Sequence, residues 1–269
     1  MKINRFSIVL SIMVCSLMGA GCQSVWTHSL APSPDGSVIA SIDRVEVQIL
    51  GPETIHIYKG AYLKIQTIQQ SKQPGFTKML IADKSEYFSS YGGLYWSPNG
   101  RNVAFTTSPK AIRPETCRLW IVDIYAKPEK NLIAENVYSF RWVDDTHMVY
   151  VTEAGDVIRA TLLDDGIVSE RKTLFSVGHS VDNIDGEYKY TSYCSRYEFD
   201  NPLSPHADYF VYGNDRDLTI VNLSTATIAK SFPLIGMPIK FWWDDASRDC
   251  VIGVEVSERR LTVTALQVL

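Results

Sequence analysis

The sequence predicts an all-β protein, a β-propeller of about five to six four-stranded blades, with a β-sandwich or an irregular barrel as the alternative. Three observations support this prediction. A strand, a tight polar turn and a second strand recur along the 269 residues. A third apolar and polar alternating segment follows each copy, and no amphipathic helix or long linker interrupts the series. Recurrence of one ordered unit favours a propeller, since a sandwich does not require it.

The clearest copy of the unit lies at residues 94–105, where Ser97-Pro98-Asn99-Gly100 separates two apolar segments. Proline presets φ for a turn, and Asn and Gly tolerate positive φ. The remaining copies of this turn are centred on Ser33, Val143, Ser204 and Trp243.

The strands after each turn show the period of two that is typical of half-buried β-strands. The third strands are expected at Ile55–Tyr58, Leu119–Ile124, Val157–Leu162, Leu218–Leu223 and Leu261–Leu266. Fourth strands are expected at Lys64–Ile68 and Arg171–Phe175, and a sixth unit is open through Tyr188–Tyr193.

The N-terminal segment 1–21 has the pattern of a secretory signal peptide. Lys2 and Arg5 precede an uncharged apolar run that ends in small residues and is shorter than the roughly 20 residues needed to span a bilayer. Residues 22–30 are expected to form a tether and to offer a strand that completes the last sheet, while residues 31–269 form a single propeller domain.

Residues 17–22, Leu-Met-Gly-Ala-Gly-Cys, resemble the lipobox of bacterial lipoproteins. Ala20, Gly21 and Cys22 match that pattern, whereas Gly19 stands where an aliphatic residue is usual. The resemblance implies that Cys22 is lipidated and becomes the new N-terminus, and Gln23 after it implies sorting to the outer membrane. The alternative is an ordinary signal peptide and a soluble periplasmic or secreted protein.

The turn and strand sequences at residues 33–40 and 96–105 resemble TolB-type propeller repeats, which also occur in prolyl-oligopeptidase-like proteins. The other copies depart from that pattern, since Asp144-Asp145-Thr146 lacks the Pro and Gly. The resemblance implies the propeller fold and partners in envelope assembly, and it implies no particular activity, because one fold serves many functions.

Charge and cysteine content exclude some classes of protein. The net charge is −4 with no basic run, so a nucleic-acid partner is not expected. Cys117, Cys194 and Cys250 remain in the exported body, and their wide spacing argues against a zinc site. Two states of these cysteines remain open: one disulfide with a leftover thiol, or three buried thiols.

Motifs for catalysis are weak. Residues 178–182 begin like a nucleophile elbow, but Asp182 replaces its last glycine and no helix signal follows Ser180. The five histidines lack metal-ligand spacing, so neither a metal nor a cofactor is expected. The acidic residues lie mostly in the repeated turns, where Asp caps backbone N–H groups, and not as a facing pair of carboxylates.

Aromatic residues offer the remaining candidates for a binding surface. The tryptophans that recur beside the turns are better explained by packing between sheets than by binding. The tyrosines of one Tyr-rich stretch do not recur at equivalent positions of the repeat. They are the candidate binding surface: Tyr188, Tyr190, Tyr193 and Tyr197.

These observations predict a lipid-anchored envelope propeller that acts as a scaffold for a protein or another envelope component. No catalysis is expected. The alternative is a secreted carbohydrate-active hydrolase that uses acidic residues in the propeller pocket. In either case the ligand is not specified by the sequence.

Overall fold

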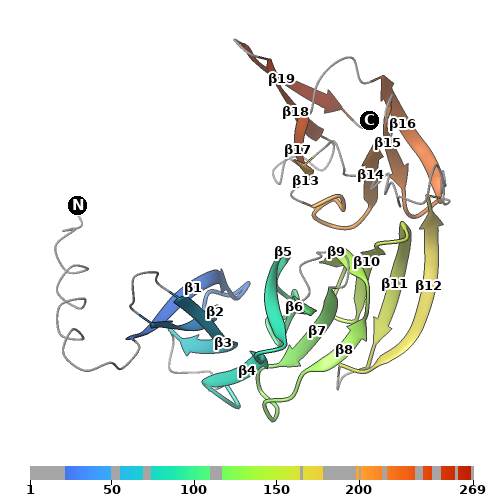
Figure 1. Ribbon diagram of the computed structural model, residues 1–269. Coiled ribbons are helices and arrows are strands. Elements are labelled where there is room, and N and C mark those ends of the chain that lie inside the picture. The colour runs from blue at the N-terminus through green and yellow to red at the C-terminus, as the bar shows by residue number, and fades with distance from the viewer. Residues whose placement is uncertain are drawn as a thin grey trace, which may run out of the picture.

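The computed structural model describes residues 22–49, 55–68, 74–109, 117–163, 166–177, 198–199, 201–213, 217–233, 239–243, 250–257 and 260–267. Strands dominate these residues and form five sheets that follow one another along the chain (Figure 1). The first sheet contains β1 (Cys22–Pro32), β2 (Val38–Ile49), β3 (Ile55–Thr67) and β4 (Lys78–Ala82). The second contains β5 (Glu86–Trp96), β6 (Asn102–Pro109), β7 (Arg118–Asp123) and β8 (Asn131–Ala134).

The next sheets continue the series. The third sheet contains β9 (Val137–Trp142), β10 (His147–Thr152), β11 (Asp156–Leu162) and β12 (Val168–Ser176). The fourth contains β14 (Tyr209–Gly213), β15 (Asp217–Asn222) and β16 (Thr227–Pro233). The fifth contains β13 (Glu198–Phe199), β17 (Ile239–Trp243), β18 (Cys250–Ser257) and β19 (Arg260–Gln267), and only its β13–β17 pair is parallel.

The sheets are arranged as blades. β1 contacts β5, and β5 contacts β9, so the first strands of the first three sheets lie next to each other. Figure 1 shows the five sheets following an arc, with the first and the last sheet at its two ends. This arrangement confirms the predicted all-β propeller. A β-sandwich would have two sheets packed face to face, whereas here five sheets follow one another.

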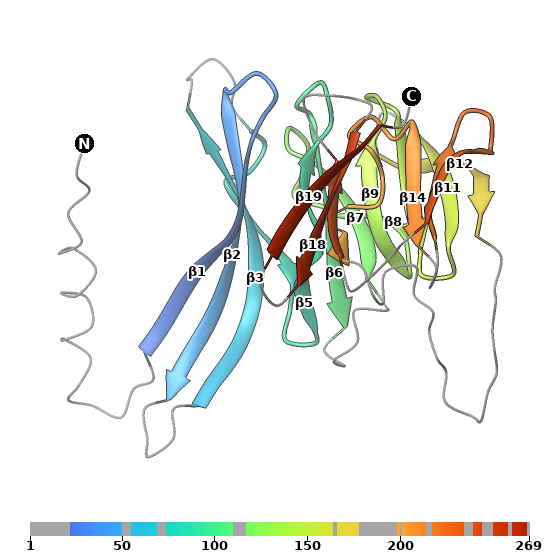
Figure 2. The ribbon, with the colours of Figure 1, turned by 90° about the horizontal axis from the view of Figure 1, so that it is seen from above.

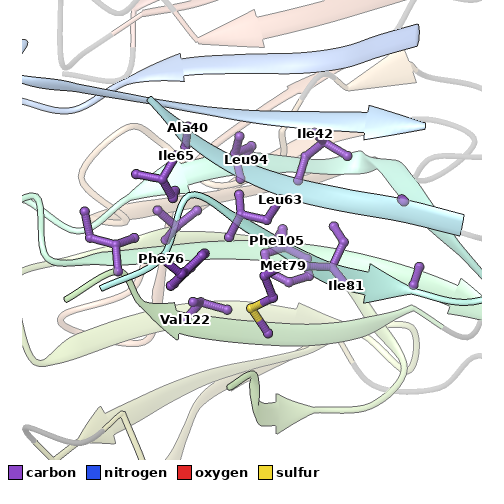
Figure 3. Close-up of a cluster of buried hydrophobic side chains, with 14 of the residues drawn as sticks. Ala40, Ile42, Leu63, Ile65, Phe76, Met79, Ile81, Leu94, Phe105 and Val122 are labelled. Atoms are coloured by element: carbon purple, nitrogen blue, oxygen red, sulfur yellow. The ribbon is translucent and has the colours of Figure 1, made fainter. Parts of the chain in front are cut away.

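Apolar cores fill the spaces between consecutive sheets. Between the first two sheets, Ile42 and Leu63 pack with Phe105 and Val122, all without significant exposure (Figure 3). Phe140 belongs to the next cluster, and Phe210 belongs to the cluster between the third and fourth sheets. Because side chains alternate along a strand, an internal sheet such as the second supplies apolar residues to both of its neighbours.

The turn between the first and second strands repeats in atomic detail. Ser33, Ser97 and Ser204 are buried, and the hydroxyl of each accepts the N–H of a residue five positions later, Val38, Asn102 or Tyr209, at 3.0, 2.9 and 3.0 Å. Gly36, Gly100 and Ala207 occupy equivalent positions with φ of 68°, 67° and 55°. The left-handed conformation explains the two glycines.

The predicted third strands are confirmed in all five sheets, as β3, β7, β11, β15 and β19. Arg171–Phe175 is confirmed within the fourth strand β12. The prediction that Lys64–Ile68 forms a fourth strand is wrong, because Lys64 to Thr67 continue β3 and the fourth strand is β4. Gly60 allows β4 to approach, since a Cβ there would lie 2.8 Å from the carbonyl oxygen of Ala82.

The N-terminal strand has a different partner from the one expected. Residues 22–30 lie in β1, which pairs antiparallel with β2 in the first sheet, so the structure does not place them in the last sheet. Ser33 to Gly36 form the short hairpin turn between the two strands. Closing this short loop costs less chain entropy than pairing β1 with the distant last sheet. The proposed sixth unit through Tyr188–Tyr193 lies outside the described residues.

Candidate interaction surface

Several of the predicted site residues lie outside the part of the chain that the structure describes. These are the four tyrosines Tyr188, Tyr190, Tyr193 and Tyr197, as well as the elbow-like residues 178–182 and the signal segment 1–21. Cys22 begins β1, but its side chain is outside the described set. Cys117 is buried and forms no disulfide within the described residues, whereas Cys194 and the side chain of Cys250 are not described. Among the described residues, no helix is long and apolar enough to cross a membrane.

The recurring tryptophans are structural in the described sheets. Trp96 and Trp142 are buried at the ends of β5 and β9. The indole N–H of Trp96 donates to the carbonyl oxygen of Ala31 at 2.9 Å, and that of Trp142 donates to Tyr95 at 3.3 Å. Each bond therefore joins the first strand of one sheet to the first strand of the sheet before it. This role explains their repeat without invoking a ligand.

Acidic residues in the described turns are also engaged in local structure. Asp35 accepts hydrogen bonds from the backbone N–H and hydroxyl of Ser37. Asp144 accepts the N–H of Thr146 at 2.8 Å, and Asp145 accepts the N–H of Asn99 from the preceding sheet at 2.7 Å. These contacts support the interpretation of the acidic residues as turn formers. Asp244 and Asp245 lie outside the described residues.

The described histidines do not converge on one point. His28 packs edge-on against Phe88, and His147 contacts the carboxylate of Asp144 at 2.9 Å. His206 is an exposed residue of a turn. Within the described part of the chain, no group of three His, Cys, Asp or Glu side chains could hold a metal ion.

The first sheet departs from the repeat in the length of its first three strands. β1, β2 and β3 contain 11, 12 and 13 residues, whereas the two central strands of the third sheet contain 6 and 7. Figure 2 shows the three long strands continuing past the neighbouring sheet and leaning away from it. We call this extension, residues 22–28, 43–49 and 55–60, the arm.

A cation and two aromatic rings attach the base of the arm to the second sheet. The guanidinium carbon of Arg44 lies 5.2 Å from the ring centre of Tyr58 and 5.7 Å from that of Tyr87, and the two rings are 4.5 Å apart. Arg44 also forms an ion pair with Glu46. Stacking of this kind stabilises by about 0.5–2 kcal/mol per contact, so the base of the arm is a fixed element.

Tyr58 is the most buried polar group of this cluster. Its side chain is 8% exposed, and its hydroxyl and the Nε of Arg44 have no hydrogen-bond partner within the described residues. Burial raises the pKa of Tyr58 above its ordinary range, although the positive charge of Arg44 acts in the opposite direction. The phenol therefore stays neutral at physiological pH.

The outer strand of the arm is exposed on both faces. No side chain of β1 from Gln23 to Pro32 is buried, and Val25 and Trp26 are 54% and 57% exposed. Trp26 lies opposite Arg44 and Val25 opposite Val45 in the ladder. Because neighbouring residues alternate, the two apolar side chains project to opposite faces of the sheet.

Sequence reasoning did not identify this surface. Its strands have the ordinary alternation of any half-buried strand, so only their length distinguishes them. The runs Val38–Ile49 and Ile55–Thr67 are each about twice the mean strand length of 5–6 residues, and this was the available signal.

Five successive, mostly antiparallel sheets, with adjacent first strands in the first three, define the chain as a β-propeller, here with an arm on its first blade. No protein-family model and no curated protein matches the sequence. Solved structures share the fold. A putative dipeptidyl aminopeptidase IV from Bacteroides ovatus has a TM-score of 0.52 at 8% identity, over 89% of this chain and 38% of that chain.

Two further structures are similar at lower scores. TolB from Acinetobacter baumannii has a TM-score of 0.45 at 11% identity, over 91% of this chain and 52% of that chain. The β-propeller domain of Cps50 (Swd1) from Myceliophteria thermophila has a TM-score of 0.44 at 12% identity, over 90% of this chain and 73% of that chain. The chain thus spans about half the length of TolB. At these identities the similarity concerns the fold alone.

Proposed function

We propose that this chain is a non-enzymatic β-propeller scaffold of the bacterial cell envelope, anchored in the outer membrane by lipid on Cys22, that binds a protein partner. One observation carries the proposal. The arm exposes Val25 and Trp26 within four residues of Cys22, on a strand none of whose side chains from Gln23 to Pro32 is buried. Exposed Trp is typical of binding hot spots.

The anchor and the binding surface are therefore on the same element. Two or three acyl chains, at about 0.8 kcal/mol per buried CH₂, would hold the protein durably at a bilayer. The arm begins at Cys22 itself, so the propeller would stand directly on its anchor without a long spacer.

The anchor is tested by replacing Cys22 with Ser in the full chain. We expect the native protein to incorporate an alkyne fatty acid and to sediment with membranes until detergent is added. The Cys22→Ser variant should remain unlabelled and appear in the soluble exported fraction. Equal labelling of the two proteins would refute lipidation.

The binding role is tested by photo-crosslinking in the native envelope, with the photoreactive residue placed at Trp26 and, as a matched control, at Ile228. Ile228 is 58% exposed on β16, in a different sheet. We expect a defined protein adduct from Trp26 and none from Ile228. Absence of adducts from both positions, together with turnover of a glycan panel by the purified protein, would replace the scaffold with the carbohydrate hydrolase.

A further inference from the structure

We propose that the free edge of β1 at Gln23–Thr27 is a strand-addition site, which binds a short, extended and uncharged segment of a partner polypeptide. This proposal rests on the proposed scaffold function and names the surface and the mode of binding. In the described sheets β1 is an edge strand, hydrogen-bonded to β2 on one side alone. Its other side presents backbone N–H and C=O groups, which an added strand satisfies.

Four other edge strands in the described sheets, β4, β8, β12 and β16, carry features that discourage such pairing. β8 has only 4 residues, and β4 has 5 and begins with Lys78. β12 carries three successive charges at residues 170–172, and β16 contains Lys230 and ends at Pro233. Short length, charge and proline are the usual protections of exposed edges.

The segment Gln23–Thr27 has none of these protections. It contains no charge and no proline, and its pairing with residues 43–47 is regular. The first irregularity is the register shift between Thr27 and Ser29, so the unprotected run is five residues long. That length matches an average β-strand.

The surroundings of this edge define the chemistry of the occupant. Arg44 and Glu46 neutralise each other beside it, as do Lys64 and Asp43. An incoming strand would thus meet no net charge. Val25 on one face and Trp26 on the other would pack against its side chains, which favours β-branched or aromatic residues.

The short length of the edge distinguishes a peptide segment from a second copy of the chain. A stable dimer buries about 1,200–2,000 Å² in total, which a five-residue edge does not provide by itself. Strand addition of a peptide, in contrast, needs only a short ladder and pockets for alternate side chains. The occupant is therefore a segment of another protein.

The experiment measures fluorescence anisotropy of a labelled, uncharged heptapeptide of alternating threonine and valine, titrated with the full mature protein in detergent. We expect saturable binding, and we expect it to be lost when alternate backbone nitrogens of the peptide are methylated. Binding should change less than about twofold between low and high salt, because the edge has no net charge.

Substitutions on the protein locate the site. Val25→Lys places a charge on the edge and should weaken binding at least tenfold, and Gln23→Lys serves as a second blocking variant. Ile228→Lys is the matched control on β16 and should leave binding unchanged. Since Val25 is 54% exposed, its substitution should not alter the melting temperature.

Three results would overturn the inference: no saturable binding, equal binding of the methylated peptide, or full binding by Val25→Lys. A dimer in sedimentation that Val25→Lys dissolves would also overturn it in favour of a second copy. If the Trp26 crosslink yields a partner but the peptide does not bind, strand addition fails while the scaffold function stands.

Discussion

Replacing Ser97 with Ala tests whether the repeated turn is held by its buried serine. The Ser97 hydroxyl accepts the N–H of Asn102 at 2.9 Å and donates to the side-chain oxygen of Asn99 at 2.7 Å, and Ser97 is fully buried. Ala leaves the N–H of Asn102 without this acceptor in a buried site. An unsatisfied buried donor costs about 1–3 kcal/mol, so we expect a loss near 2 kcal/mol.

The assay is thermal and urea unfolding followed by circular dichroism. A loss of about 2 kcal/mol corresponds to a drop in Tm of roughly 4–8 °C for a domain of this size. The equivalent substitutions at Ser33 and Ser204 should cost the same within a factor of about two. Ser85→Ala is the control, because Ser85 makes a similar bond to Asp83 but is exposed. Losses below about 0.5 kcal/mol at all three buried serines would refute the reasoning.

Three further predictions concern single residues. Gly36→Ala should cost about 1 kcal/mol in urea unfolding, because φ is +68° and no atom within 4 Å would meet the new Cβ, which leaves conformational strain as the sole cause. Trp142→Phe keeps an aromatic ring, but it removes the indole N–H that bonds the Tyr95 carbonyl and leaves part of a buried site unfilled, so it should lower the unfolding free energy by at least about 0.5–1.5 kcal/mol. Burial alone would raise the pKa of Asp144, but its hydrogen bonds, led by that from the Thr146 N–H, outweigh burial and lower the pKa. The stability that the ionised Asp144 contributes is therefore present above about pH 3.9, and it is lost as pH falls through the pKa of the folded state. Asp144→Asn should lack that loss in melting scans from pH 6 to 3.

The propeller could be predicted because each unit carries its own local signals. Ser97-Pro98-Asn99-Gly100 and its copies specify the turn, and the alternation after each turn specifies the third strand. The fourth strand of the first sheet was harder to predict, since β3 runs without a break from Ile55 to Thr67 and no Gly or Pro directly follows its end. Periodicity marks where strands are, but it does not divide one long strand from two short ones.

The arm could not be predicted for a related reason. Whether Val25 and Trp26 are buried depends on what packs beside β1, which is a property of the sheet arrangement and not of the local sequence. The bond from Trp96 to the Ala31 carbonyl likewise joins residues 65 positions apart. The sequence could show that these tryptophans repeat, but the blade geometry was needed to show what they bond.

The position of the arm follows from the way blades stabilise one another. An internal sheet is packed on both faces, as the second sheet is by the clusters around Phe105 and Phe140, so its side chains are committed to neighbours. The first sheet stands at one end of the arc and has such a cluster only on the side of the second sheet among the described residues. Its strands can therefore lengthen without disturbing another interface, and β1 can carry exposed apolar residues at little cost to folding. In a series of similar blades, the terminal blade is the one on which a binding element can be added most freely.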